Sequence, residues 1–594
     1  MKKIYVSILA AALTAMAGMA QDNLQKEITL PKDFVPVVKK ATKKSALPRV
    51  LKPVKGAETS NIDYTDWAEP TAVSVEIPTM LPYGYRTGHR FSKERGYIDA
   101  GAGSQLNIVG SAGYRLVDDE TLKVGAWLQH NSTWNGKNSN EAFSDVKQKF
   151  CDNVIGVDAE KTFGSGNLNI GAKVHFDRFN YYAQSYILEG AAPSRPLWWE
   201  NDQNFLDMSL GGTWKGKVNV SRFHDVSYIV GFNYNYAGYK YGFNPASPLV
   251  YDGFKGAKEH HIQASLGAKY GIAANSTVGM DFKFDLQSRC HNEVTDRVLD
   301  VVEKVSDNTS MITIAPYYTY YGQNLLARLG LNMNVSFSDG AALRFAPNVQ
   351  LAYEFTQGVS LYANAEGGKR INTLARVAAI NRYLDPNGMY CNTFVPLDAE
   401  AGFKIGPFNG LTARAFFGYG IFKDNLESVD RAWDSGSGVM NFDCKGMKAG
   451  AEVKFKYRSV FDVKLAFTYA PQDDTMEAGK SYGGYALGLD HAKTVANADL
   501  NLYLFKGFTI GTGLEYRGGR RYFNRTNSAV SDELLYYVWD MNNVMNLHAG
   551  ASYRFDKYLT LWVKADNLLN KQWDVLNGMG AQKLSVMGGI GFVF

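Results

Sequence analysis

The side chains that most often carry out catalysis or bind metal ions are scattered along this sequence. The four cysteines, at positions 151, 290, 391 and 444, include no CxxC pair, a spacing that argues against a metal cluster or a redox motif. The nine histidines show no pairing with a nucleophile. His260 and His261 are adjacent, so on a strand they point to opposite faces. We therefore predict that the protein is not an enzyme and has no resident cofactor or metal.

Other candidates have ordinary explanations. A single histidine such as His175 is expected to be a solvated polar residue. The pair Gly518 and Gly519 is expected at the end of a strand, without the following helix that a phosphate-binding loop requires. The formal net charge is only +5, and the sequence contains no long run of basic residues. A nucleic-acid partner is therefore not expected.

The chain begins with the pattern of a secretory signal peptide, which we assign to residues 1–20. Lys2 and Lys3 precede an apolar run over residues 4–17, and small residues follow up to Ala20. This run is too short to cross a membrane as a helix. After it no stretch approaches about 18 apolar residues, so the mature chain is either a soluble periplasmic protein or a closed membrane barrel.

Residues 21–95 are rich in proline and lysine and have no sustained hydrophobic period. They predict an extended arm, in the periplasm or in the lumen of a barrel, and not a globular domain. The basic stretch from Lys39 to Lys44 could pair with acidic side chains of a lumen, and we expect the arm to occupy part of it.

From residue 96 to residue 594 apolar and polar residues alternate along most of the chain. Between Met447 and Tyr457 every second residue is alanine or larger and apolar, and the others are charged or glycine. Because consecutive side chains on a strand point to opposite faces, each such strand has one apolar and one polar face. The apolar sets are longer than the about five or six residues of a usual soluble strand, and they match the about 9–11 residues that cross a bilayer. The pattern predicts an all-β fold, a transmembrane antiparallel β-barrel.

The connectors between these segments are alternately short and long. Outer-membrane barrels have short periplasmic turns and longer outer loops. The count is about 22 strands, within a range of about 18–24. Pro316 and Pro347 fall inside predicted strands, where we expect β-bulges. The longer loops are predicted at residues 135–147, 180–200, 241–256, 291–308, 370–392, 424–444, 474–490, 520–541 and 570–581.

The last predicted strand carries the most specific pattern. Its apolar face ends at the chain's final aromatic residue, which resembles the recognition signal that directs bacterial outer-membrane proteins to their assembly machinery. We assign this membrane-assembly role to five residues: Leu584, Val586, Ile590, Phe592 and Phe594.

The stretch from Asp566 to Trp573, with the sequence DNLLNKQW, precedes this strand. Together they resemble the C-terminal hairpin of TonB-dependent receptors over about 40 residues. The resemblance implies an outer-membrane barrel of about 22 strands that takes up large solutes. Such receptors carry a globular plug of well over a hundred residues, whereas residues 21–95 are too few for one. The plug-less receptor-like barrels of Bacteroidetes-type bacteria are therefore the best match.

Charged residues on the polar faces are expected to line a lumen. A wet, charged interior motivates the first hypothesis, a monomeric barrel that passes a solute. The second is a structural or assembly component whose arm and loops bind a surface lipoprotein or a periplasmic partner, with outer-membrane lipids around the wall. The predicted lumen-facing residues are Glu354, Lys448, Glu452, Lys454, Lys456, Asp462 and Asp566. A lumen of this width is too wide for wall side chains alone to fill, so the arm or inward-folded loops must fill it.

Overall fold

The computed structural model describes residues 94–594 except 138–146, 182–201, 220–224, 243–254, 297–300, 339–341, 385–386, 389, 432–436, 478–480, 486, 488–489, 528–533, 557 and 577–578. The predicted signal peptide and nearly all of the predicted arm lie outside the described residues. No helix in the described part of the chain is long and apolar enough to cross a membrane.

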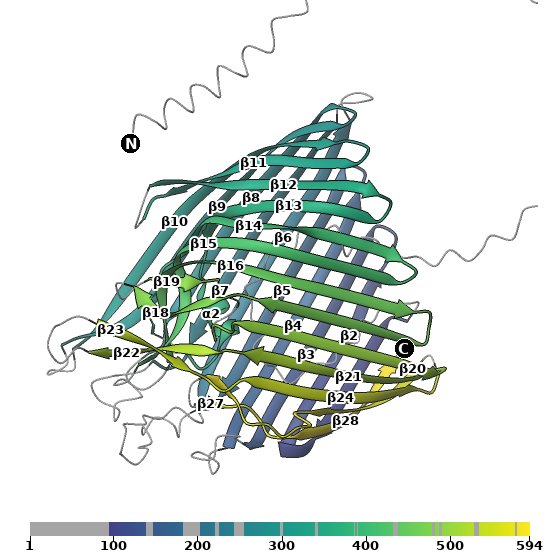
Figure 1. Ribbon diagram of the computed structural model, residues 1–594, viewed down its shortest axis with the longest axis vertical. Helices are drawn as coiled ribbons and strands as arrows, with labels where there is room; N and C mark the ends of the chain where they lie inside the picture. The colour runs from purple at the N-terminus through teal and green to yellow at the C-terminus, as the bar shows by residue number, and fades with distance from the viewer. Residues whose placement is uncertain are drawn as a thin grey trace, which may run out of the picture. The chain divides into compact units, whose positions relative to one another are not determined.

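One antiparallel sheet closes on itself and forms a barrel (Figure 1). Its first strand, β1 (Gly96–Gly103), pairs with both β2 (Asn107–Asp118) and the last strand, β28 (Ser585–Val593). At the seam Gly96 N–H donates to the Phe594 carbonyl at 2.8 Å, and Phe594 N–H returns the bond to Gly96 at 2.9 Å. Closure leaves no unpaired edge, as a membrane-spanning sheet requires.

The sheet has 26 strands. Four of them form two hairpins in the connections, and the other 22 form the wall of the barrel. This confirms the predicted fold and strand number. The other wall strands are β3 (Leu122–Lys137), β4 (Lys147–Phe163), β5 (Gly166–Phe179), β6 (Gln203–Asn219), β7 (Asp225–Tyr239), β8 (Lys258–Ala273), β9 (Ser276–Asp296), β10 (Val301–Tyr321), β11 (Leu325–Ser336), β12 (Leu343–Thr356), β13 (Val359–Arg370), β14 (Thr393–Phe408), β15 (Leu411–Arg431), β16 (Ser437–Tyr457), β17 (Phe461–Tyr469), β20 (Thr494–Phe505), β21 (Phe508–Gly518), β24 (Val544–Arg554) and β25 (Leu559–Asp566).

The remaining elements belong to the connections at the long-loop end. They are the helical turn η2 (Ser104–Leu106), the helix α2 (Leu374–Ile380), the hairpin of β18 (Gln472–Glu477) with β19 (Ser481–Gly484), the hairpin of β22 (Arg521–Asn527) with β23 (Leu534–Asp540), and the short pair β26 (Asp574–Leu576) and β27 (Met579–Gly580).

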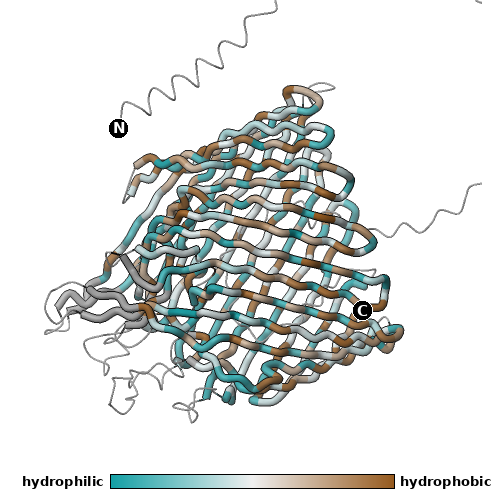
Figure 2. Tube along the Cα trace, in the orientation of Figure 1, coloured by the Kyte–Doolittle hydropathy of each residue, from teal (hydrophilic) through white to brown (hydrophobic). Residues whose placement is uncertain are grey.

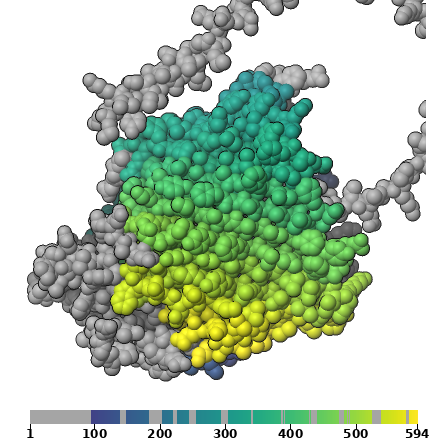
Figure 3. Space-filling model, viewed as in Figure 1, coloured from purple at the N-terminus to yellow at the C-terminus, as the bar shows by residue number. Residues whose placement is uncertain are grey.

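The two faces of the wall differ as the alternation predicts. Apolar and polar residues alternate along many of the wall strands, visible as alternating brown and teal along the tube in Figure 2. On β5, Ile170, Val174 and Phe176 are exposed on the outer face, where lipid would contact them. In the space-filling view, strands from teal to yellow lie side by side in chain order over one side of the wall (Figure 3).

The predictions for two of the long loops were wrong. Residues 291–308 and 424–444 belong largely to β9, β10, β15 and β16, each of 21 residues. Hairpins that continue past the membrane contact no lipid, so their sequences lack the apolar alternation that reveals a strand. For the same reason the two hairpins within residues 474–490 and 520–541 were assigned to loops.

The prolines lie in strands, but without the expected bulges. On either side of Pro316 the ladder of β10 with β11 keeps the same register, from Ile314 opposite Met333 to Tyr317 opposite Gly330. Pro347 pairs with Leu331 without a shift and precedes the first pair of the β12–β13 ladder. Pro316 interrupts one ladder locally and Pro347 lies just before one begins, and both strands continue.

Candidate functional site in the barrel lumen

The five residues of the predicted assembly signal share the outer face of the final strand. Their side chains are between 41% and 48% exposed, while Ser585 and Met587 between them are buried. This is the arrangement of a strand that faces lipid on one side. The role of the five residues in assembly remains a prediction.

The predicted lumen residues occupy the inner face at different heights. Lys456 lies opposite Asp462 in the β16–β17 ladder. Asp462 accepts hydrogen bonds from Asn501 Nδ2 at 3.0 Å and Tyr503 Oη at 2.5 Å. Glu354 accepts a bond from Gly358 N–H at 3.0 Å, in the turn after β12. These three lie near the short turns, away from the others.

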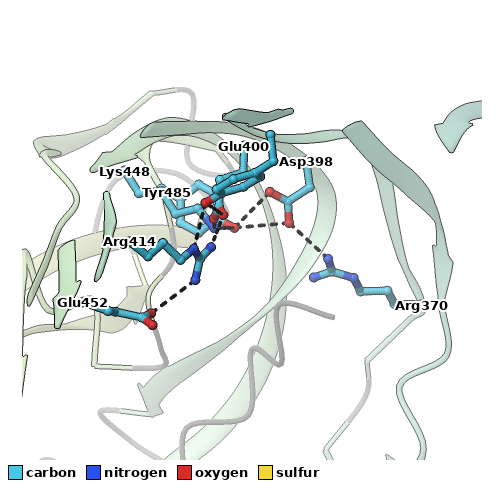
Figure 4. A network of polar contacts seen from close by, with 8 residues as sticks. Arg370, Asp398, Glu400, Arg414, Lys448, Glu452 and Tyr485 are labelled. Carbon is cyan, nitrogen blue, oxygen red and sulfur yellow. Dashed lines mark hydrogen bonds and ion pairs between the residues drawn. The ribbon is translucent and has the colours of Figure 1, made fainter. Parts of the chain in front are cut away.

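Lys448 and Glu452 belong to a buried polar network on β13 to β16 (Figure 4). Glu400 is its centre: the Arg414 guanidinium and the Tyr362 hydroxyl both donate to its carboxylate. Lys448 Nζ lies 3.2 Å from the other Glu400 oxygen. Arg414 also contacts Glu452 at 3.2 Å. The network neutralises charges that would otherwise be costly in a partly dry interior.

The same network fixes a connection from the long-loop end. Tyr485 follows β19, and its hydroxyl donates to Asp398 at 3.1 Å and accepts from Lys448 Nζ at 3.1 Å. Arg370 Nη2 lies 3.5 Å from the same Asp398 carboxylate. The connection between β17 and β20 is therefore attached to the inner face of the wall.

A second connection enters the lumen. We call residues 371–392, between β13 and β14 and including α2, the inner loop. Thr373 caps α2 by accepting from Arg376 N–H at 3.2 Å, and Leu374 N–H donates to the buried Glu259 carboxylate of β8 at 3.0 Å. Gln287 of β9 donates to the Asn372 carbonyl. The apolar side of the loop packs with side chains of the wall in one buried cluster: Phe150, Phe179, Tyr181, Phe205, Ala237, Tyr239, Ala257, Leu374, Ala378 and Tyr383.

The inner loop reaches the wall eight strands away from β13. Asp152 on β4 and Asp177 on β5 face each other directly across the ladder, an arrangement of like charges that is destabilising by itself. Arg382 of the inner loop lies 2.8 Å from Asp177 and 3.5 Å from Asp152, and its side chain is mostly buried. We call these three residues the Arg382 cluster. It joins two parts of the wall across the lumen.

The connection around residues 482–493 is attached by further buried charges. Glu427 of β15 accepts from the Tyr482 hydroxyl at 2.6 Å, and His491 Nε2 lies 3.0 Å from its second oxygen. Asp490 pairs with Arg517 and Arg520. Burial alone raises the pKa of Asp490, but the two guanidiniums outweigh it and hold that pKa well below its usual range.

The inner loop partly covers a space in the lumen. A cavity of about 740 Å³, which we call the chamber, lies between Asn381, Arg382 and Tyr383 on one side and the inner faces of β16 to β25 on the other. Of the predicted lumen residues, Glu452, Lys454 and Asp566 line it. A second hollow of about 1080 Å³ follows the inner face of β2 to β7, nearer the short turns.

The DNLLNKQW stretch forms a turn that closes the final hairpin. Asn567 and Asn570 adopt positive φ values of 52° and 46°, which asparagine tolerates better than most residues. Asn567 Nδ2 donates to the Lys571 and Gln582 carbonyls at 3.0 Å, and Trp573 is buried at 1% exposure. The motif has a structural role in directing residues 571–583 toward the chamber.

Sequence reasoning missed the residues that fix the loops, namely Arg382, Asp152, Asp177, Tyr485 and Asp490. Their partners lie far along the chain, as Arg382 and Asp152 do at a separation of 230 residues. The only available signal was the pair of aspartates, which become neighbours once the β4–β5 register is known. In the described part of the chain, no three His, Cys, Asp or Glu side chains gather closely enough to hold a metal ion.

The closed wall, the apolar outer face and the charged, loop-filled lumen define a large membrane barrel of the outer-membrane type. No family model and no curated protein matches the chain. Solved structures with the same fold include the siderophore receptor PirA from Acinetobacter baumannii, at a TM-score of 0.61 and 10% identity, covering 84% of this chain and 80% of the receptor. The FrpB iron transporter from Neisseria meningitidis has a TM-score of 0.59 and 11% identity, with 85% and 82% covered.

The ferric enterobactin receptor PfeA from Pseudomonas aeruginosa, solved as a variant with enterobactin, is similar at a TM-score of 0.60 and 12% identity, with 84% of this chain and 81% of the receptor covered. At such identities the likeness concerns the fold. This likeness supports the predicted resemblance to TonB-dependent receptors for the fold of the barrel.

Proposed function

We propose that this protein is an outer-membrane barrel that takes up a solute through its lumen, and that the inner loop keeps the passage closed at rest. The observation that carries the proposal is the Arg382 cluster, which joins the inner loop to the opposite wall. A 22-stranded barrel is too wide for its wall side chains to fill, so closure must come from other parts of the chain.

The inner loop is held by polar contacts in addition to its apolar packing against the wall. The polar contacts are ion pairs at Arg382, hydrogen bonds at Asn372, Leu374 and Tyr383, and a bond from Arg289 Nη2 to the Gly388 carbonyl at 3.0 Å. A solute that offers alternative partners to these groups can compete with them. The chamber and the hollow along β2 to β7 are then two spaces that such a solute can occupy on its way toward the short turns.

Several finer assignments belong to the same proposal. The barrel is of the plug-less kind seen in Bacteroidetes-type bacteria, supported by connections of the chain itself that occupy the lumen. Residues 1–20 are removed as a signal peptide and residues 21–95 act as an arm. The protein is not an enzyme, and lipids contact its apolar outer face. Any surface lipoprotein or periplasmic partner would bind the arm or the outer connections.

The test is solute influx into proteoliposomes, measured as osmotic swelling in a small neutral sugar. Arg382→Gln removes the charge that holds the inner loop and leaves Asp152 and Asp177 to repel each other. We expect faster swelling than with the unmodified protein. The matched control is Arg328→Gln, which breaks a lumen ion pair with Asp281 at 3.5 Å without touching the inner loop, and its swelling rate should not change. Equal rates for the two variants would contradict the proposal.

A further inference from the structure

The chamber has the size of a binding site. Its volume of about 740 Å³ falls within the about 300–1,000 Å³ of pockets that hold small ligands. Phe150, Tyr383 and Trp573 line it, but each is buried against other side chains at 6% exposure or less. Little ring surface is therefore open for a sugar to stack on, and recognition in the chamber must rely on polar and charged groups.

Most of the charges that line the chamber are already compensated. Arg382 pairs with Asp177, Arg517 with Asp490, and Glu452 with Arg414. Asp499 lies 3.9 Å from His548 Nε2. Gly513 leaves room for that contact, since a Cβ there would lie 2.3 Å from the His548 ring and 2.7 Å from the Asp499 carboxylate.

Four charged side chains of the chamber stand apart from these pairs. They are Lys464 on β17, Glu515 on β21, Asp566 at the end of β25 and Lys583 just before β28. None of them forms an ion pair within 4.0 Å with any residue that the structure describes. A group of this kind in a partly covered space is available to a ligand of the opposite charge.

Lys464 is separated along the wall from the two carboxylates, whereas Lys583 lies two residues before Ser585, the partner of Asp566. Lys464 lies directly opposite Lys454 across the β16–β17 ladder, so two ammonium groups share one part of the wall. Glu515 lies two strands further on, past β20, and Asp566 four strands further on. Asp499 on β20 lies opposite Lys464 and Gly513, so Glu515 is two strands and two residues away from Lys464. With about 4.8 Å between strands and about 3.4 Å per residue, the two positions are about 12 Å apart along the wall. The chamber therefore presents an uncompensated ammonium group and an uncompensated carboxylate at a fixed separation, among charges that are paired.

We propose that the chamber binds a zwitterionic solute whose ammonium and carboxylate groups fit between two wall positions about 12 Å apart, of the class of short linear peptides. Three residues of extended chain span about 10 Å, and the two side chains reach toward the solute, so a peptide of about three residues places its carboxylate near Lys464 and its ammonium near Glu515. This inference rests on the proposed function, because the peptide is then the solute that the barrel takes up.

The test is isothermal titration calorimetry of the purified full chain in detergent, where no passage across a membrane is needed. The probes are trialanine with free termini and the same peptide with an acetylated N-terminus and an amidated C-terminus. We expect trialanine to bind and the capped peptide to bind at least about tenfold more weakly, since two charge-assisted contacts are lost. Equal affinities, or no binding of trialanine, would overturn the proposal without any variant.

Two variants locate the site. Lys464→Gln and Glu515→Gln should each weaken trialanine binding about tenfold and leave the weak binding of the capped peptide unchanged. The controls Lys283→Gln and Glu354→Gln change the same residue types on the inner faces of β9 and β12, outside the chamber, and should bind as the unmodified protein does. Unchanged affinity in both chamber variants would overturn the assignment.

The outcome is separate from that of the swelling assay. If Arg382→Gln accelerates swelling but trialanine does not bind, the solute class is wrong and the proposed function stands. If trialanine binds as described but swelling never responds to Arg382→Gln, the chamber is a peptide site in a barrel that does not work by release of the inner loop.

Discussion

Single residues hold the connections of this barrel in place, and Asp490 is the clearest example. It is the shared partner of Arg517 and Arg520, and Arg520 is 3% exposed. Replacing Asp490 by Asn leaves two buried cations without their counter-ion, although Arg520 keeps its bonds to the Asn542 and Asp574 carbonyls. We expect a loss of about 3 kcal/mol in unfolding free energy, measured by urea unfolding in detergent.

The pH dependence of this contact follows from the direction of the pKa shift. Because the folded pKa of Asp490 lies below its unfolded value, its stabilisation is complete above the unfolded pKa and is lost only as the pH falls through the folded one. The effect of Asp490→Asn should therefore be the same at pH 7 and pH 5. As a control, Asp118→Asn breaks a more exposed pair with Arg115 and should cost less than about 1 kcal/mol.

At the scale of elements, the final strand should decide assembly. Phe592→Asp together with Phe594→Asp places carboxylates on the lipid face next to the β1 seam, where they disfavour insertion. We expect the outer-membrane level of the protein to fall sharply, measured by immunoblot of membrane fractions. The matched control is Val593→Asp, which lies between them on the inner face. Normal outer-membrane levels of the double variant would contradict the proposed role of the final strand in assembly.

The sequence revealed the elements that contact lipid and failed for those that do not. Alternation predicted the wall because lipid on one side and water on the other impose a period of two residues, as on β16 from Met447 to Tyr457. Near the long-loop end of β9 and β10, polar residues occupy both alternate sets of positions in the sequence, and no period marks a strand there. The inner loop is the extreme case, since its partners Asp177 and Asp152 lie on strands eight and nine positions away from β13.

The sequence predicted some of the lumen residues but not the contacts between them. Lys448, Glu452 and Lys454 could be placed on the inner face by counting alternate residues along one strand. Which of them would be neutralised and which would line a chamber depended on Arg414, Glu400 and Tyr485, which come from other strands or connections. A single sequence gives no register between strands, so it cannot show those contacts.

The whole molecule is a closed hydrogen-bonded sheet, and closure predicts a property that no part of it has alone. Opening the barrel must break a whole ladder between two wall strands, so the barrel should resist detergent until it is boiled. We expect unboiled and boiled samples to migrate differently on a denaturing gel. Identical migration would contradict the membrane-barrel fold.

The most direct test of the central claim is single-channel conductance in planar bilayers after the inner loop is shortened. Arg370 and Thr393 are paired at the ends of β13 and β14, so a short glycine–serine linker in place of residues 374–390 can join them without strain on the wall. We predict that the unmodified barrel is closed or opens only briefly, and that the shortened barrel gives large, stable conductance steps while remaining heat-modifiable. A shortened barrel that stays as closed as the unmodified one, or an unmodified barrel that is already fully open, would contradict the claim that the inner loop closes the passage.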